Sequence, residues 1–413
     1  MHSAKRQILF VNLAHTITHY ALLILATAVL GMIAQEPGRF GDGYGAILAL
    51  GTGLFVVYGA GSLPMGWLAA RFGSKAMMVA FFLGSGLCLI AAGFATGPFS
   101  LALTLALAGA FLAIYHPVGT AMLVEAAGDK IGRSVGVNGA FGNFGVALAP
   151  VVTALLAQVA GWRWGFLVPG VVCVVAGLLY LREPAFDAHK ARAAARPFPA
   201  IPPAVVRRAV ITLMSIAVVS GLVFNAFTLL LPRLMQERLA SSPDLLPLVG
   251  GLAFAVTLTG GLTQFTVGRM IDRMTLKRVF LPLGLIPLPA FLLLWRAEGW
   301  AVLVLSALIA AAIFGQVTVN ETMTARYIAP ALRVKLYSIR FFVGFLGAAA
   351  ASPLIAWLYG LGGGVGLVLL VLAGFGTVTL LCALFFPDRP EELRPELWAA
   401  EAPPAPPAAV AAE

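Results

Sequence analysis

Twelve long apolar stretches follow one another along this chain of 413 residues. A hydrocarbon core of about 30 Å is crossed by ~20 predominantly apolar helical residues, so each stretch can span a bilayer. Only 11% of the residues are charged and the mean hydropathy is +0.95, whereas a soluble protein has about a quarter charged residues. The sequence therefore predicts an all-α integral membrane protein. The expected spans are 8–34, 44–69, 76–96, 99–123, 134–159, 163–181, 209–232, 246–270, 278–295, 300–325, 335–358 and 364–386.

A ten-residue signature occurs twice, as Gly66–Lys75 and as Gly268–Lys277, with its two starts 202 residues apart. Each copy leads from one apolar stretch through Gly and basic residues into the next, so it marks the same loop in two related halves. We therefore expect two pseudo-symmetric halves of six helices each. The expected boundaries are 1–182 and 208–387 for the halves, 183–207 for a cytoplasmic linker and 388–413 for a disordered cytoplasmic tail.

The distribution of basic residues predicts the orientation in the membrane. With the amino terminus in the cytoplasm, 21 of the 27 Lys and Arg residues fall in cytoplasmic segments. Cytoplasmic loops carry an excess of basic residues, so both termini are predicted to be cytoplasmic. The formal charge of +10 follows from this basic face beside an anionic leaflet, and it requires no nucleic-acid partner. The expected location is a bacterial inner (cytoplasmic) membrane.

The doubled loop is similar to the loop motif of the major facilitator superfamily of secondary transporters, Gly-x-Leu-x-Asp-Arg-x-Gly-Arg-Arg/Lys. The first copy has Ala70 where the family has an acid, and it matches at Gly66, Leu68, Arg71, Gly73 and Lys75. The second copy keeps the acid, and it matches at Gly268, Asp272, Arg273 and Lys277. The resemblance covers the chain to about residue 387 and implies alternating access by two halves, which these loops clamp on the cytoplasmic side. A tight turn without a gating role is the alternative for each copy.

Two further segments resemble smaller groups within that superfamily. Residues 113–119, Ala-Ile-Tyr-His-Pro-Val-Gly, are similar to the Tyr-His-Pro-x-Gly segment of the fosmidomycin-resistance group of drug exporters. The fifth apolar stretch resembles the Gly-rich motif of antiporters, with Gly136, Gly139, Gly142, Gly145 and Pro150. Close helix packing explains these glycines equally well, because small residues let helix backbones approach in lipid.

Three histidines lie within apolar stretches. Asn12, His15, Thr16 and His19 are spaced by three and four, so they share one face of the first helix. His116 lies at about the same depth in the fourth helix, ~10–12 Å from the cytoplasmic end. In the superfamily, helices 1, 4, 7 and 10 line a central cavity, so the resemblance brings these histidines together as a substrate or proton site.

Neutral packing histidines are the alternative. A transition-metal site is also conceivable, but no Asp, Glu or Cys with ligand spacing joins the three histidines, so we assign no metal ligand and no cofactor. Polar residues of the second half are the remaining site candidates: Asn225 in the seventh helix, Gln316, Asn320 and Glu321 in the tenth, and Arg340 in the eleventh. Glu321 and Arg340 are expected at similar depth, so we predict an ion pair, acting either as a proton-linked switch or as a static contact.

The sequence favours a secondary transporter over an enzyme. It contains no Gly-x-x-x-x-Gly-Lys-Ser/Thr motif, so we expect no nucleotide partner and an ion gradient as the energy source. The expected function is proton-coupled export of a small organic molecule by a monomer in the lipid bilayer. Uptake of a metabolite or organic anion is the nearest alternative. The remote alternatives are an intramembrane histidine-dependent metalloenzyme and a non-transporting receptor.

Overall fold

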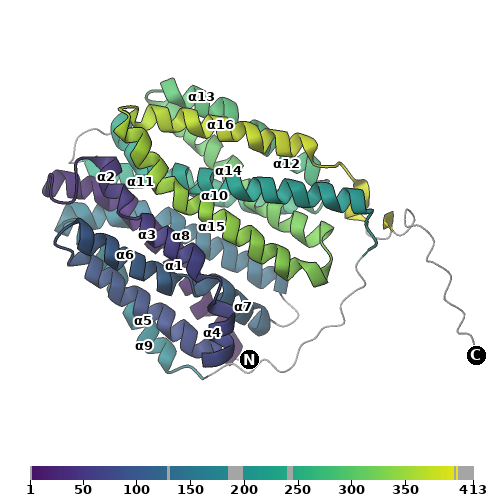
Figure 1. Cartoon of the computed structure of the whole chain (residues 1–413), viewed down its shortest axis with the longest axis horizontal. Helices are drawn as coiled ribbons and strands as arrows, with labels where there is room; N and C mark the ends of the chain where they lie inside the picture. Colours follow the sequence, from purple (N-terminus) through teal and green to yellow (C-terminus); the bar gives the residue numbers. More distant parts are fainter. Residues whose placement is uncertain (1, 128–130, 185–198, 240–244, 395–396, 399–413) are drawn as a thin grey trace, which may run out of the picture.

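A computed structural model describes residues 2–127, 131–184, 199–239, 245–394 and 397–398. It contains twelve helical segments that are long and apolar enough to cross a membrane, which confirms the predicted number. Segments of the first half, purple to blue in Figure 1, lie beside those of the second half, green to yellow. The amino terminus lies at the same end of the bundle as α4 and α7 (Figure 1).

The first half runs from α1 to α9. Its elements are α1 (His2–Gln35), α2 (Tyr44–Ala49), α3 (Thr52–Gly61), α4 (Met65–Phe72), α5 (Ser74–Gly93), α6 (Pro98–Leu112), the π-helix η1 (Tyr115–Gly119), α7 (Thr120–Ala127), α8 (Ile131–Ala160) and α9 (Trp164–Leu181).

The second half runs from α10 to α16. Its elements are α10 (Pro203–Leu239), α11 (Leu246–Ile271), α12 (Leu276–Leu285), α13 (Pro287–Arg296), α14 (Trp300–Tyr327), α15 (Pro330–Gly360), α16 (Gly364–Phe385) and a 3₁₀ turn, η4 (Pro390–Leu393).

Three predicted spans are interrupted rather than continuous. The second divides into α2, α3 and α4, with Gly51 and Pro64 as the residues that precede α3 and α4. The fourth widens into the π-helix around Pro117, and the ninth divides at Pro287, which begins α13. A proline has no backbone N–H to continue a helix, so breaks at such positions are expected from its chemistry. The predicted single helices were therefore too regular at these points.

Two described segments lie across the expected domain boundaries. The helix α10 begins at Pro203, so residues 203–207 of the expected linker belong to this helix. Residues 185–198 of the linker lie outside the described residues. The expected disordered tail is packed where it is described. Glu392 accepts hydrogen bonds from the Tyr327 hydroxyl and the Leu276 N–H, and the Trp398 ring is 2% exposed. Burial of the Trp398 indole and the hydrogen bonds of Glu392 offset the loss of conformational entropy when this segment is ordered. Residues 399–413 lie outside the described chain.

The two copies of the loop signature lie at one end of the bundle, which we call the loop face. In the first copy, Gly73 alone separates α4 from α5, with φ of 84° that favours glycine. Lys75 donates to the Leu181 carbonyl oxygen at 3.1 Å, and Lys277 donates to that of Phe386 at 2.6 Å. Each lysine thus caps the end of the last membrane helix in its own half, where the helix dipole favours a cation.

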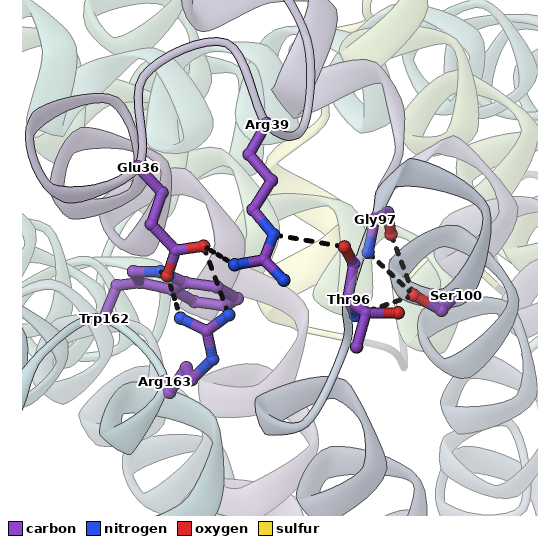
Figure 2. A network of polar contacts seen from close by, with 7 residues as sticks. All are labelled: Glu36, Arg39, Thr96, Gly97, Ser100, Trp162 and Arg163. Atoms are coloured by element: carbon purple, nitrogen blue, oxygen red, sulfur yellow. Dashed lines mark hydrogen bonds and ion pairs between the residues drawn. The ribbon is translucent and has the colours of Figure 1, made fainter.

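The opposite end, the far face, is held by a network around Glu36 (Figure 2). Glu36 follows α1 and accepts hydrogen bonds from Arg163, from Trp162 Nε1 at 3.1 Å and from Arg39 at 2.7 Å. Arg39 also donates to the Thr96 carbonyl oxygen at 3.2 Å. These hydrogen bonds link the connections that follow α1, α5 and α8. The hydrogen bond from Arg163 is the main reason that the pKa of Glu36 is lowered to about 2.

The halves touch each other in the part of the bundle nearer the far face. The Tyr44 hydroxyl donates to a backbone oxygen of α10 at 2.7 Å, and the Ser352 hydroxyl donates to one of α2 at 2.6 Å. The backbone of Gly250 lies so close to α8 that a Cβ there would be 2.6 Å from the Pro150 oxygen. These contacts close the far-face side between the halves.

Candidate functional site

A cavity of about 410 Å³ lies between the two halves. Its walls come from α1, α3, η1, the start of α7 and α8 of the first half and from α10, α11, the start of α13, α14, α15 and α16 of the second. The lining residues lie in the loop-face portions of these helices or near their midpoints: His15 precedes the midpoint of α1, His19 lies at it, and Glu321 is near the loop-face end of α14. The cavity therefore occupies the loop-face side of the bundle, opposite the far-face contacts.

The structure brings the three membrane histidines together on the wall of this cavity. The Nε2 atoms of His15 and His19 are 3.1 Å apart. The His116 ring centroid lies 5.5 Å from that of His15 and 5.7 Å from that of His19. His15 and His19 share one face of α1, and His116 lies at the depth that the sequence predicted. The three residues form one cluster, which we call the histidine triad.

The orientation of His15 is set by α8. Its Nδ1 lies 2.7 Å from the backbone oxygen of Asn138. Because a carbonyl oxygen only accepts, Nδ1 carries the hydrogen, and Nε2 presents its lone pair to His19. The Asn138 side chain is held in turn by the Tyr115 hydroxyl and by Asn12, each at 2.9 Å. Asn12, predicted as a site residue, therefore acts on the triad through Asn138.

His116 reaches the triad from the π-helix η1. The wider turn there includes Pro117, and π-helical turns of this kind are frequent at functional sites. The His116 ring also faces the second half, with centroids 6.2 Å from Phe341 and 6.0 Å from Phe345. Within the described residues, the His116 ring makes no hydrogen bond. It is thus a contact point between the halves at the cavity.

The glycines of the fifth span, which forms α8, differ in how closely other residues pack against them. A Cβ on Gly142 would lie 2.6 Å from the His15 ring, and a Cβ on Gly145 would lie 2.2 Å from the Thr16 backbone oxygen. Gly139 lines the cavity with open space around it. Gly136 belongs to α8, but its surroundings lie outside the described residues. Gly142 and Gly145 therefore allow α8 to approach α1 at the triad.

Across the cavity, Glu321 of α14 and Arg340 of α15 form the ion pair that the sequence suggested. The Arg340 side chain is 11% exposed and the Glu321 side chain is 42% exposed, so the carboxylate is the more accessible member. The Arg340 guanidinium also lies 5.0 Å from the Phe341 ring. The second half thus presents an acidic group to the cavity beside covered positive charge.

The other polar candidates of the second half line the same cavity. Asn225 donates to the Gly221 oxygen of its own helix at 2.8 Å, and Gln316 donates to the Leu283 oxygen at 3.0 Å. The side-chain oxygen of Asn320 is buried without a hydrogen-bond partner in the described structure. Asn225 and Gln316 therefore have packing hydrogen bonds, whereas Asn320 keeps an acceptor available at the cavity wall.

Several lining residues were missed by the sequence reasoning. Asn143 and Gln264 are hydrogen bonded across the two halves, and both line the cavity. Tyr58 is buried there with a hydroxyl that has no partner in the described structure. Polar side chains inside apolar spans were the available signal for Asn143 and Gln264.

The candidate gating residues are arranged differently in the two copies. Arg71 is exposed beside the Trp67 and Phe72 rings, and Gly66 and Gly268 have open space around them. Asp272 and Arg273 are exposed in the turn after α11. In the described part of the chain, no hydrogen bond or ion pair from these residues crosses to the other half.

Comparison with known sequences decides the family. The sequence matches the Major Facilitator Superfamily over residues 11–261 and 234–411. The chain belongs to the Major Facilitator Superfamily. This family identifies the protein as a transporter rather than an enzyme, so the histidine-dependent metalloenzyme alternative is withdrawn.

Solved structures share the fold of this Major Facilitator Superfamily protein. A bacterial homolog of the human lysosomal transporter Spinster, inward-facing and occupied, has a TM-score of 0.70 at 12% identity, over 97% of each chain. Its inward-facing and unoccupied conformation has a TM-score of 0.68 at 12% identity, over 98% of this chain and 99% of that one.

One curated relative is similar over a shorter stretch. The Puromycin resistance protein pur8 of Streptomyces alboniger is 31% identical over 128 residues, which are 30% of this chain. The match spans only 25% of that relative's length.

Proposed function

We propose that this protein is a proton-coupled exporter of a small organic molecule, working by alternating access. The observation that supports this most is the cavity itself, because it holds titratable groups from both halves. The histidine triad belongs to the first half and Glu321 belongs to the second. Groups that gain and lose protons on both sides of one cavity can link protonation to the rocking of the halves.

The conformation suits the loading step of an exporter. With the predicted orientation, the loop face is cytoplasmic, so the cavity faces the cytoplasm while the far-face contacts of Tyr44 and Ser352 close the other side. A cytoplasmic substrate would enter from this side. Rocking of the halves would then break the far-face contacts and bring the loops together.

The cavity wall favours a neutral or cationic amphipathic substrate. It is rich in aromatic side chains, and its accessible charged group is the Glu321 carboxylate. A carboxylate beside aromatic faces attracts a cation, whereas Arg340 is largely covered and less suited to hold an anion. The partial match to a puromycin resistance protein also supports a drug-like compound. Organic-anion uptake is therefore the weaker proposal.

Proton coupling would act through competition at Glu321. A proton on this carboxylate removes its attraction both for Arg340 and for a cationic substrate. Protons entering from the outside would therefore release the substrate there, and the return to the cytoplasmic side would release the protons. The histidine triad lies across the same cavity and can share this role.

Proton flux in liposomes tests the proposal. Purified protein is reconstituted with a trapped pH-sensitive dye, and puromycin, other cationic drugs and organic anions are added one at a time. We expect a compound-dependent proton flux that the Glu321→Gln variant abolishes and that His189→Ala, in the expected linker, leaves unchanged. Flux with anions alone would support uptake instead. Absence of flux with the whole panel would contradict the proposal and favour a non-transporting role.

A further inference from the structure

The histidine triad has a property that its proton role does not require. One ring nitrogen from each of His15, His19 and His116 lies within 4.8 Å of the others. Two of these nitrogens are already 3.1 Å apart. Three imidazole nitrogens bound at about 2.0–2.1 Å to a tetrahedral ion are spaced by roughly 3.3–3.4 Å. A movement of the His116 ring toward His15 and His19 by somewhat more than an ångström would bring the three nitrogens to this spacing.

The surroundings of His15 match those of a metal ligand. Imidazoles that bind metals nearly always donate their other ring N–H to a carbonyl or carboxylate, which orients the ring. His15 Nδ1 donates to the Asn138 carbonyl oxygen at 2.7 Å, so Nε2 is free of hydrogen on the side of the triad. The Asn138 side chain is fixed by Tyr115 and Asn12. The polar contacts around Asn138 therefore fix the orientation of the His15 ring.

The other two rings can complete such a site. His19 and His15 are one helical turn apart on α1, the spacing that places two imidazoles on one ion. His19 now carries its hydrogen on Nε2, since His15 Nε2 accepts it, and moving it to Nδ1 would free the Nε2 lone pair. His116 makes only ring contacts among the described residues, so its ring can turn toward the other two.

We propose that His15, His19 and His116 form a three-imidazole binding site for a divalent transition-metal ion of the zinc, cobalt or nickel type. The remaining coordination position faces the cavity, where a donor atom of an organic ligand can take it. The cargo is accordingly a small organic chelate of such an ion. This inference rests on the proposed function, because it names the cargo of the same cavity.

Cobalt binding tests the site directly. Co²⁺ is titrated into the full chain, purified without a polyhistidine tag, and its visible absorption is followed. We expect one Co²⁺ per chain with an intense tetrahedral spectrum, and binding weakened by at least about 100-fold in His15→Ala and His116→Ala. The His189→Ala control should bind as the unchanged protein does. Absence of stoichiometric binding, or equal binding by His15→Ala, would overturn the site.

A second variant keeps the test valid if an alanine variant folds poorly. His19→Cys replaces one ligand by another, so Co²⁺ should still bind and should show a new thiolate-to-cobalt charge-transfer band. A bound Co²⁺ without that band would exclude residue 19 as a ligand and overturn the three-imidazole site.

The cargo is tested by proton flux with free Zn²⁺ and with Zn²⁺ citrate. Flux with Zn²⁺ citrate supports the chelate as cargo, whereas flux with free Zn²⁺ alone would overturn the chelate in favour of the bare ion. Drug-dependent flux without any response to metal would overturn the metal cargo while leaving the proposed exporter. Histidine-dependent Co²⁺ binding without flux from any compound would overturn the exporter and its metal cargo, and leave only the binding site.

Discussion

At the scale of single residues, the site depends on how one ring is held. His15 is oriented by α8, and Gly142 provides the space for its imidazole. Because a Cβ at Gly142 would lie 2.6 Å from that ring, Gly142→Ala should displace His15. We expect a loss of about 1–3 kcal/mol in stability and a strong loss of transport. Gly139→Ala is the matched control, since a Cβ there has nothing within 4 Å. Thermal unfolding in detergent and flux in liposomes measure both; equal behaviour of the two variants would contradict this account.

The Glu321 and Arg340 pair gives a second prediction at this scale. Arg340→Ala should leave the Glu321 carboxylate without its partner and lower stability by about 1–3 kcal/mol. The loss of stability should be smaller than the loss from breaking a fully buried ion pair, because the Glu321 side chain is 42% exposed. In the double variant with Glu321→Gln, the uncompensated charge is gone, so stability should return in part. A double-mutant cycle on melting temperatures measures this coupling, and fully additive losses would exclude an energetic role for the pair.

At the scale of elements, the connections at the far face act as one fastened unit. Glu36 joins the segments after α1, α5 and α8 through Arg39, Trp162 and Arg163 (Figure 2). Glu36→Gln should lower stability at pH 7 by about 1–2 kcal/mol, because a charge-assisted network is lost. Asp42→Asn is the matched control, since Asp42 is exposed on the same connection. Melting temperatures in detergent would show no difference between the two variants if the network contributes nothing.

The pH dependence of this network has a definite sign. The pKa of Glu36 is lowered to about 2 in the folded protein, mainly by the hydrogen bond from Arg163. In an unfolded chain the pKa of a glutamate is about 4.3. The folded state therefore binds fewer protons than the unfolded state in this range. The contribution of Glu36 to the free energy of unfolding is present above pH ~4.3 and is lost as pH falls toward 2. The stability difference between the unchanged protein and Glu36→Gln should shrink between pH 5 and pH 3. A constant difference would contradict the linkage.

At the scale of the whole molecule, the proposed alternating access requires the loop face to close. Ala70 stands where the superfamily motif has an acid, and it is exposed at the end of α4. Ala70→Asp should supply the missing carboxylate and shift the population toward closure of the loop face. A cysteine at Val317, which lines the cavity and is 40% exposed, should then be labelled more slowly from the cytoplasm. Ala70→Asn is the control of similar shape. Equal labelling rates in all three proteins would contradict a latch at this position.

The amino-acid sequence by itself determined the membrane helices, the two halves and the depths of the polar groups. Apolar length and the loop repeat depend on local sequence, and a helix converts spacing into depth at 1.5 Å per residue. The face shared by His15 and His19, and the level at which His116 lies, followed from that regularity.

Only the tertiary structure decided which polar groups meet. The spans are interrupted or widened near Gly51, Pro117 and Pro287, and residue spacing alone does not encode how the segments on either side are oriented. Packing of Gly142 against His15 and the carbonyl of Asn138 then selected the orientation of the ring. The tail shows the same limit, because Trp398 is buried by residues far from it in the sequence. Composition predicted a disordered tail there, whereas the contacts of Trp398 depend on surfaces that exist only once the helices have packed.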